Sequence, residues 1–187
     1  MKHTHSTVRF FIFLGLVVSS LAQAKNAVDI ARDHHQKNAV RIVSEFRDFL
    51  AIPNVASDLG NMMDNAAFIE AYVGRRGFTS KVVTAGGAPY VIAEKAGSAS
   101  APIVLVYAHF DGQPVIPSQW SSPPFEPTLW TDNPLQADAR SLSWDQEQFD
   151  PSWRVVARSA GDDKAPVIAL MAAIDALEAA GAMPDIT

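Results

Sequence analysis

The chain has 187 residues, with 15 basic and 20 acidic side chains and no cysteine. The net charge of −5 argues against a nucleic-acid partner, because proteins that bind phosphate backbones carry an excess of Lys and Arg. A chain without cysteine has neither disulfides nor thiolate ligands, so His and carboxylate side chains must hold any bound metal.

Residues 1–24 have the pattern of a secretory signal peptide. Lys2 and Arg9 precede an apolar run at 10–18, and small residues lead to Ala24. The alternative is a membrane anchor, but the apolar run is about half of the roughly 20 residues needed to span a bilayer. We therefore predict cleavage near Ala24, a periplasmic or secreted location without a stable membrane anchor, and one domain at 25–187.

The next part of the chain predicts two helices and two strands. Apolar residues recur with helical spacing at 42–50 and at 62–73, and the first helix is expected to stop at Pro53. Two β-rich runs follow at 79–84 and 90–94, separated by glycines and a proline.

Residues 103–108 have the sequence IVLVYA, which is apolar on both faces, as expected of a strand buried between helical layers. A short strand at 153–157 and a helix marked by apolar residues from Val167 to Leu177 come later. Strands interleaved with helices predict an α/β fold, namely part of a three-layer α/β/α domain with a largely parallel central sheet.

A long Pro-rich and Trp-rich loop is predicted at 117–153. Such a loop after a central strand is either a functional flap or a poorly ordered insertion. The flap is favoured because aromatic side chains are costly to leave in water. The loop holds all four tryptophans: Trp120, Trp130, Trp144 and Trp153.

Two short acidic motifs carry the candidate chemistry. His109 and Asp111 follow the strand at 103–108, and residues two apart in an extended segment point to the same side. A metal-binding imidazole usually donates its other N–H to a carboxylate, so this pair suits a metal ligand and its orienting partner. Asp162 and Asp163 enter a helix, where one carboxylate could bridge two cations. The alternatives are an ordinary surface turn for the first motif and a helix cap for the second.

Three segments resemble the zinc-dependent exopeptidases that include carnosinases, glutamate carboxypeptidases, aminoacylases and succinyl-diaminopimelate desuccinylases. They are VLVYAHFDGQP at 104–114, Trp120 with PPFEP at 123–127, and RSAGDDKAP at 158–166. The Gln-Pro pair after Asp111 looks most like the dipeptidase branch. The resemblance runs from about residue 40 to residue 187, with the motifs in the same order and strand context.

The resemblance implies a site with two zinc ions that activate water for hydrolysis of a dipeptide or short peptide. His109 would ligate one zinc, Asp111 would be the catalytic carboxylate that orients that imidazole, and Asp162 would bridge the ions. The peptide bond between Asp162 and Asp163 is expected to be cis, and Lys164 is expected to be structural. Relatives are often homodimers, through a domain that this chain does not include.

The family's general-base Glu and distal ligands have no counterpart before Thr187, so the resemblance implies an amino-terminal fragment of the enzyme. The chain also departs from the family pattern at Ser159 and Ala165, where relatives usually have Gly. Two other functions stay open: a noncatalytic binding remnant of the fold, or a zinc amidohydrolase that deacylates N-acyl amino acids. His34 and His35 are adjacent on a helix and are expected to be polar surface residues rather than a metal pair.

Overall fold

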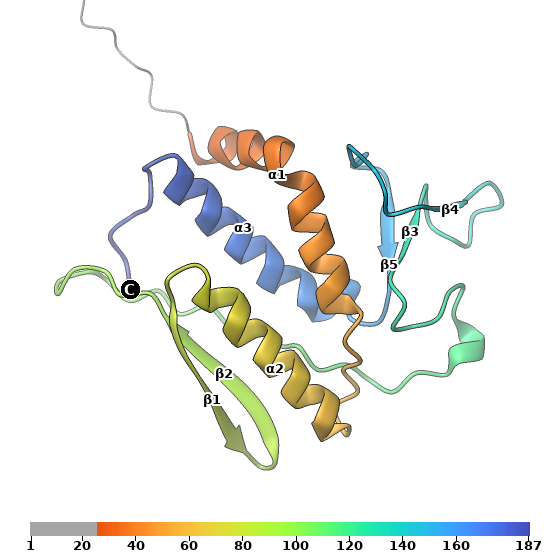
Figure 1. Cartoon of the computed structure of the whole chain (residues 1–187), viewed down its shortest axis with the longest axis horizontal. Coiled ribbons are helices and arrows are strands. Elements are labelled where there is room, and N and C mark those ends of the chain that lie inside the picture. The colour runs from red at the N-terminus through yellow and green to blue at the C-terminus, as the bar shows by residue number, and fades with distance from the viewer. Residues whose placement is uncertain (1–25) are drawn as a thin grey trace, which may run out of the picture.

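The computed structural model describes residues 26–187, so the predicted signal peptide lies outside the described part. Three helices pack beside one another: α1 (Ala27–Leu50), α2 (Leu59–Gly74) and α3 (Ala165–Ala179) (Figure 1). Their predicted positions are confirmed, except that α1 begins earlier. The side chain of Asn26 accepts a hydrogen bond from the Asp29 amide and so starts that helix ahead of its apolar stripe. None of the helices in residues 26–187 is long and apolar enough to cross a bilayer.

The hydrophobic core lies between the three helices. Aromatic rings from α1 and α2 stack within it, with Phe49 and Phe68 centroids 4.7 Å apart and Phe68 and Tyr72 centroids 5.6 Å apart. The buried members of this core are Phe49, Ile69, Tyr72, Val73, Ile168, Met171 and Ile174.

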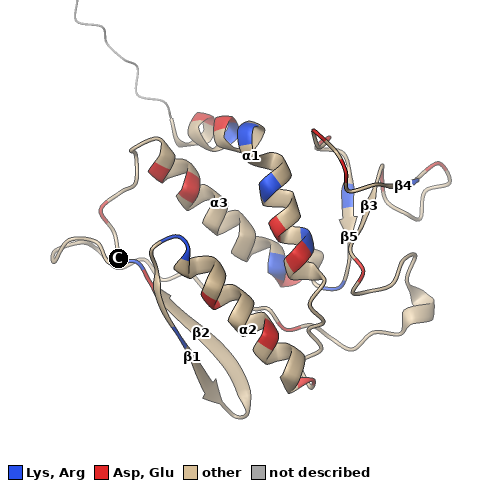
Figure 2. Ribbon diagram, viewed as in Figure 1, with Lys and Arg blue, Asp and Glu red and all other residues tan. Residues whose placement is uncertain are grey.

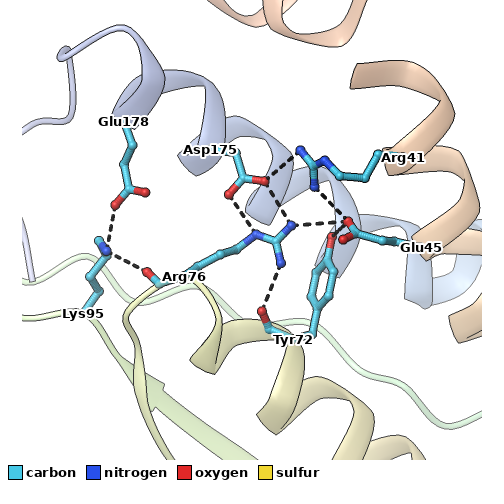
Figure 3. Close-up of polar contacts among 7 residues, drawn as sticks. All are labelled: Arg41, Glu45, Tyr72, Arg76, Lys95, Asp175 and Glu178. Carbon is cyan, nitrogen blue, oxygen red and sulfur yellow. Dashed lines mark hydrogen bonds and ion pairs between the residues drawn. The ribbon is translucent and has the colours of Figure 1, made fainter. Parts of the chain in front are cut away.

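A buried arginine and two half-buried carboxylates join the same helices (Figure 3). Arg76 follows α2 and donates to Asp175 of α3 through Nε at 2.8 Å and through a second nitrogen at 3.0 Å. It also lies 3.3 Å from the carboxylate of Glu45 on α1, and Tyr72 donates to that carboxylate at 3.1 Å. We call these residues, together with Arg41, the helix-joining cluster. Figure 2 shows both signs of charge along α1, where part of the cluster lies.

The strands form two small antiparallel sheets. The hairpin of β1 (Thr79–Ala85) and β2 (Ala88–Glu94) matches the predicted strands, and Gly86 and Gly87 take positive φ at its turn. A second sheet has the order β4–β3–β5, formed by β3 (Thr128–Trp130), β4 (Ser141–Leu142) and β5 (Arg154–Val156). Helices with small sheets confirm the α/β class.

The predicted parallel sheet differs from what residues 26–187 form. Every strand pair in these two sheets is antiparallel, and the predicted strand at 153–157 pairs with β3. Residues 103–108 are not assigned as a strand, and Ile103, Leu105 and Tyr107 are 81%, 92% and 82% exposed. The reason is that a strand needs a neighbour. The backbone bonds of this segment include Val104 N–H to the carbonyl of Thr187 at 2.7 Å, but no neighbouring strand of the described part covers it.

The predicted loop at 117–153 is built around the second sheet, because β3 and β4 lie within it. All four tryptophans are half-buried. Trp144 donates its ring N–H to the carbonyl of Pro127 at 3.0 Å, and the guanidinium of Arg158 lies 4.9 Å from the ring centroid of Trp120. The loop is thus held by its own aromatic side chains, and its role as a flap stays a prediction.

Candidate functional site

Two segments meet beside the amino-terminal end of α3. We call residues 109–112 the histidine loop and residues 159–164 the aspartate loop. His109 lies between two carboxylates: its Nδ1 is 3.0 Å from Oδ1 of Asp111, and its Nε2 is 2.9 Å from Oδ1 of Asp162. The structure therefore brings together all three residues that the sequence singled out.

A second contact joins the two loops through the backbone. The amide of His109 donates to Oδ2 of Asp163 at 3.3 Å. The peptide bond between Asp162 and Asp163 is cis, as the resemblance implied. The sequence left the second aspartate without a role, and this hydrogen bond gives it one: Asp163 holds the backbone of the imidazole that faces Asp162.

The electrostatics of the site centre on the imidazole. Burial disfavours its charge, but the hydrogen bond and the negative charge of Asp111, with a further contribution from Asp162, outweigh that effect and raise the pKa of His109 above 6.5. The side chain of Asp162 is 91% exposed and that of His109 is 37% exposed. Solvent and solutes therefore reach the pair directly.

Lys164 fastens the aspartate loop to the end of α1. Its side chain is fully buried, and its Nζ donates to the carbonyls of Phe49 at 2.7 Å and Ile52 at 2.8 Å. The ammonium also lies 4.5 Å from the centroid of the Phe49 ring. Burial lowers the pKa of Lys164 to about 7. Its contacts point into the core, as expected of a structural residue.

Ser159 adopts a left-handed conformation with φ of 62°, at a position where the resembling family usually has glycine. A left-handed backbone costs a residue with a Cβ roughly 1–2 kcal/mol. The hydroxyl of Ser159 accepts a hydrogen bond from the side-chain amide of Asn54 at 2.9 Å, which offsets part of this cost.

Asn54 was missed by the sequence analysis. It follows Ile52 and Pro53, where an asparagine is ordinary turn chemistry, and nothing local indicates that it is fully buried. The one available signal was its position just past the end of a helix whose last turn is apolar. His34 and His35 lie on α1, half-buried and exposed respectively, and are not part of the site.

The donors suit zinc in kind but fall short in number. An imidazole nitrogen with a carboxylate on its other ring nitrogen is the usual arrangement at zinc, and a carboxylate oxygen is the second donor. Catalytic zinc sites normally have three protein ligands, yet residues 26–187 contain no cluster of three or more His, Cys, Asp or Glu side chains arranged to hold a metal. The described residues therefore supply fewer donors than such a zinc site requires.

No protein-family model matches the sequence, and no curated protein sequence matches it significantly. Among solved structures, the chain is similar to the di-peptidase Dug1p from Saccharomyces cerevisiae, with a TM-score of 0.62 and 20% sequence identity. The match covers 84% of this chain and 32% of Dug1p, so the chain spans about a third of the length of that neighbour. A likeness at this identity shows a shared fold.

Proposed function

We propose that the chain is the amino-terminal part of an exported metallopeptidase that uses two zinc ions to hydrolyse dipeptides or short peptides. One observation carries the proposal: a single imidazole contacts Asp111 through one ring nitrogen and Asp162 through the other, at 3.0 and 2.9 Å. The fold shared with a di-peptidase supports peptides as the substrate class.

Each residue would have a distinct role. With metal bound, Asp111 would accept the Nδ1 proton of His109, which would fix the tautomer and leave the Nε2 lone pair for the metal. Asp162 presents an exposed carboxylate with two oxygens, which suits a bridge between two ions. Bound zinc would supply a polarised substrate carbonyl and an activated water.

The proposal assigns this chain only part of the catalytic apparatus. The described residues offer two ligands, and the chain spans about a third of the neighbour whose fold it shares. The remaining ligands and the general base of the proposed enzyme would come from outside residues 26–187. Residues 1–24 would direct the protein to the periplasm or the medium, followed by cleavage near Ala24.

Metal binding is tested by calorimetric titration of the purified chain with Zn²⁺. We expect His109→Ala to lower the affinity at least tenfold, since it removes the nitrogen ligand. The matched control is His35→Ala, because His35 is an exposed histidine on α1 that belongs to neither the histidine loop nor the aspartate loop. Equal affinities of the wild type and His109→Ala would rule out the site.

The substrate class is tested in cells that carry the native gene. Periplasmic and medium fractions are assayed with a panel of dipeptides and N-acetyl amino acids, before and after His109→Ala is introduced at the chromosomal copy. Loss of dipeptide hydrolysis supports the proposal. Loss of deacylation instead supports the amidohydrolase alternative, and activity confined to the cytoplasm contradicts export.

A further inference from the structure

We infer that Asn54 is a positioning residue that sets the separation of the histidine loop and the aspartate loop. The inference rests on the proposed function, because its consequence for metal binding assumes that His109 and Asp162 are ligands. Asn54 contacts neither of these side chains. It contacts the loop that carries each of them.

The side-chain amide of Asn54 donates to both loops at once. Its Nδ2 lies 2.7 Å from the carbonyl oxygen of Phe110, the residue between His109 and Asp111, and 2.9 Å from Oγ of Ser159. The two acceptors are 56 and 105 residues away in sequence, so this nitrogen joins segments that no local interaction connects.

The backbone of the same segment supports the histidine loop. The amide of Gly112 donates to the carbonyl of Asn54 at 2.6 Å, and the amide of Ala56 donates to the carbonyl of Gly112 at 3.0 Å. Val55 and Gly112 thereby form a parallel bridge. The histidine loop is thus aligned against residues 54–56 by main-chain bonds, and the Asn54 side chain extends this alignment to the aspartate loop.

The histidine loop and the aspartate loop pack closely against each other at Gly112. A Cβ at Gly112 would lie 2.8 Å from Oγ of Ser159 and 3.1 Å from Oδ1 of Asn54, closer than such atoms normally approach. A small movement of either loop would therefore collide with the other or break a hydrogen bond. Close contact together with directional bonds is what a fixed ligand separation requires.

An asparagine suits this position because two acceptors must be satisfied by one buried group. Its amide has two N–H bonds, one for each acceptor, whereas an aspartate of the same shape would present only oxygens to the carbonyl of Phe110. Asn54 is fully buried, so water does not replace the bonds that a substitution removes.

The chain offers a closely matched control in Asn65. It is also fully buried, and its Nδ2 also donates two hydrogen bonds, to the carbonyls of Pro53 at 2.8 Å and Asn61 at 2.7 Å. Neither acceptor belongs to the histidine loop or the aspartate loop. Asn54→Ala and Asn65→Ala therefore remove the same chemistry from the same depth, and only the first releases the two loops.

Two measurements on the full chain test the inference, both made at a temperature where each variant is folded. The first is calorimetric affinity for Zn²⁺ alone, which we expect to fall roughly tenfold or more in Asn54→Ala, as for other residues that orient metal ligands. The second is hydrogen exchange without metal at the amides of His109 and Lys164, which donate to Asp163 and Ser159. We expect exchange at both to accelerate about tenfold in Asn54→Ala.

Asn65→Ala is expected to leave both quantities near wild type even if it lowers the melting temperature as much. Equal changes in the two variants would overturn the inference, because the effect would then follow from lost stability. If the wild type does not bind Zn²⁺, the metal site proposed for this chain fails, and the exchange of His109 and Lys164 still decides whether Asn54 positions the loops. A third variant, Asn54→Asp, keeps the shape and should reproduce the exchange effect, and wild-type exchange in it would also overturn the inference.

Discussion

The helix-joining cluster gives a sharp test of how burial sets the strength of an ion pair. Arg76 and Arg41 contact the same two carboxylates, Asp175 and Glu45. The side chain of Arg76 is 7% exposed and that of Arg41 is 41% exposed. Arg76 also donates to the carbonyl of Tyr72 at 3.0 Å and lies 4.0 Å from the centroid of its ring. We therefore expect the substitutions Arg76→Met and Arg41→Met to differ widely in cost.

Removing one partner of a buried pair costs about 3–5 kcal/mol, because the other charge is left without compensation. The carboxylates of Asp175 and Glu45 keep some solvent contact and retain Arg41, so Arg76→Met should fall at the lower end, at about 3 kcal/mol. Arg41→Met removes an exposed partner and should cost less than about 1 kcal/mol. For a chain of this length, about 3 kcal/mol corresponds to a fall in Tm of roughly 6–12 °C.

The assay is urea unfolding followed by circular dichroism, with the free energy of unfolding taken from the midpoint at an unchanged slope. Adding Asp175→Leu to Arg76→Met should recover part of the loss, because the half-buried carboxylate that has lost its main partner is then removed as well. The reasoning would be refuted by equal losses in the two single variants, or by a loss below about 1 kcal/mol for Arg76→Met.

Three further outcomes can be checked on the same chain. Burial lowers the pKa of Lys164 to about 7 in the folded chain, against an ordinary value of 10.5, so the unfolded state binds more protons between these values and stability should rise with pH across that window. In Lys164→Met, urea midpoints measured from pH 7 to 10 should lose this rise. Gly112→Ala should lower the unfolding free energy by about 1–3 kcal/mol, because its Cβ would lie 2.8 Å from the hydroxyl oxygen of Ser159. The control Gly74→Ala would place its Cβ where no atom lies within 4 Å, so it should not lower the unfolding free energy. Thermal melts of both variants check this difference. Leu105→Lys should reduce self-association in sedimentation velocity, because the apolar residues at 103–107 are exposed side by side along the chain. Leu135→Lys changes a leucine that is also highly exposed but has polar neighbours in sequence, and it should have little effect.

Features that depend on residues close together in sequence could be predicted from the sequence. The helices and the β1–β2 hairpin depend on local spacing and on the glycines at 86 and 87, and their positions were predicted closely. His109, Asp111 and Asp162 were singled out as candidates because their motifs are local. Their contact requires two loops that are far apart in sequence to meet, which the structure shows.

Features that depend on distant partners could not be predicted. The apolar sequence at 103–108 specifies a segment that suits burial in a sheet, but not which strands lie beside it. Asn54 has the residue type and sequence position of a turn residue. Its hydrogen bonds to Phe110 and Ser159 could not be predicted, because these acceptors become its neighbours only in the fold. Local pattern therefore singled out the candidate side chains, and tertiary contacts determined how they are held.

The end of α1 connects the stability of the fold with the geometry of the site. The carbonyls of Phe49 and Ile52 accept hydrogen bonds from Lys164 of the aspartate loop. Two residues further on, the carbonyl of Asn54 accepts a hydrogen bond from the amide of Gly112 in the histidine loop. The loops that carry both candidate ligands are thus hydrogen-bonded to one short segment, residues 49–54. Helix α3 begins directly after Lys164. The helix-joining cluster fixes α1 and α3 to each other farther along, at Glu45 and Asp175. Substitutions in that cluster should therefore lower the temperature at which the site unfolds without changing the proposed zinc affinity of the folded chain, whereas substitution of Asn54 should change that affinity itself.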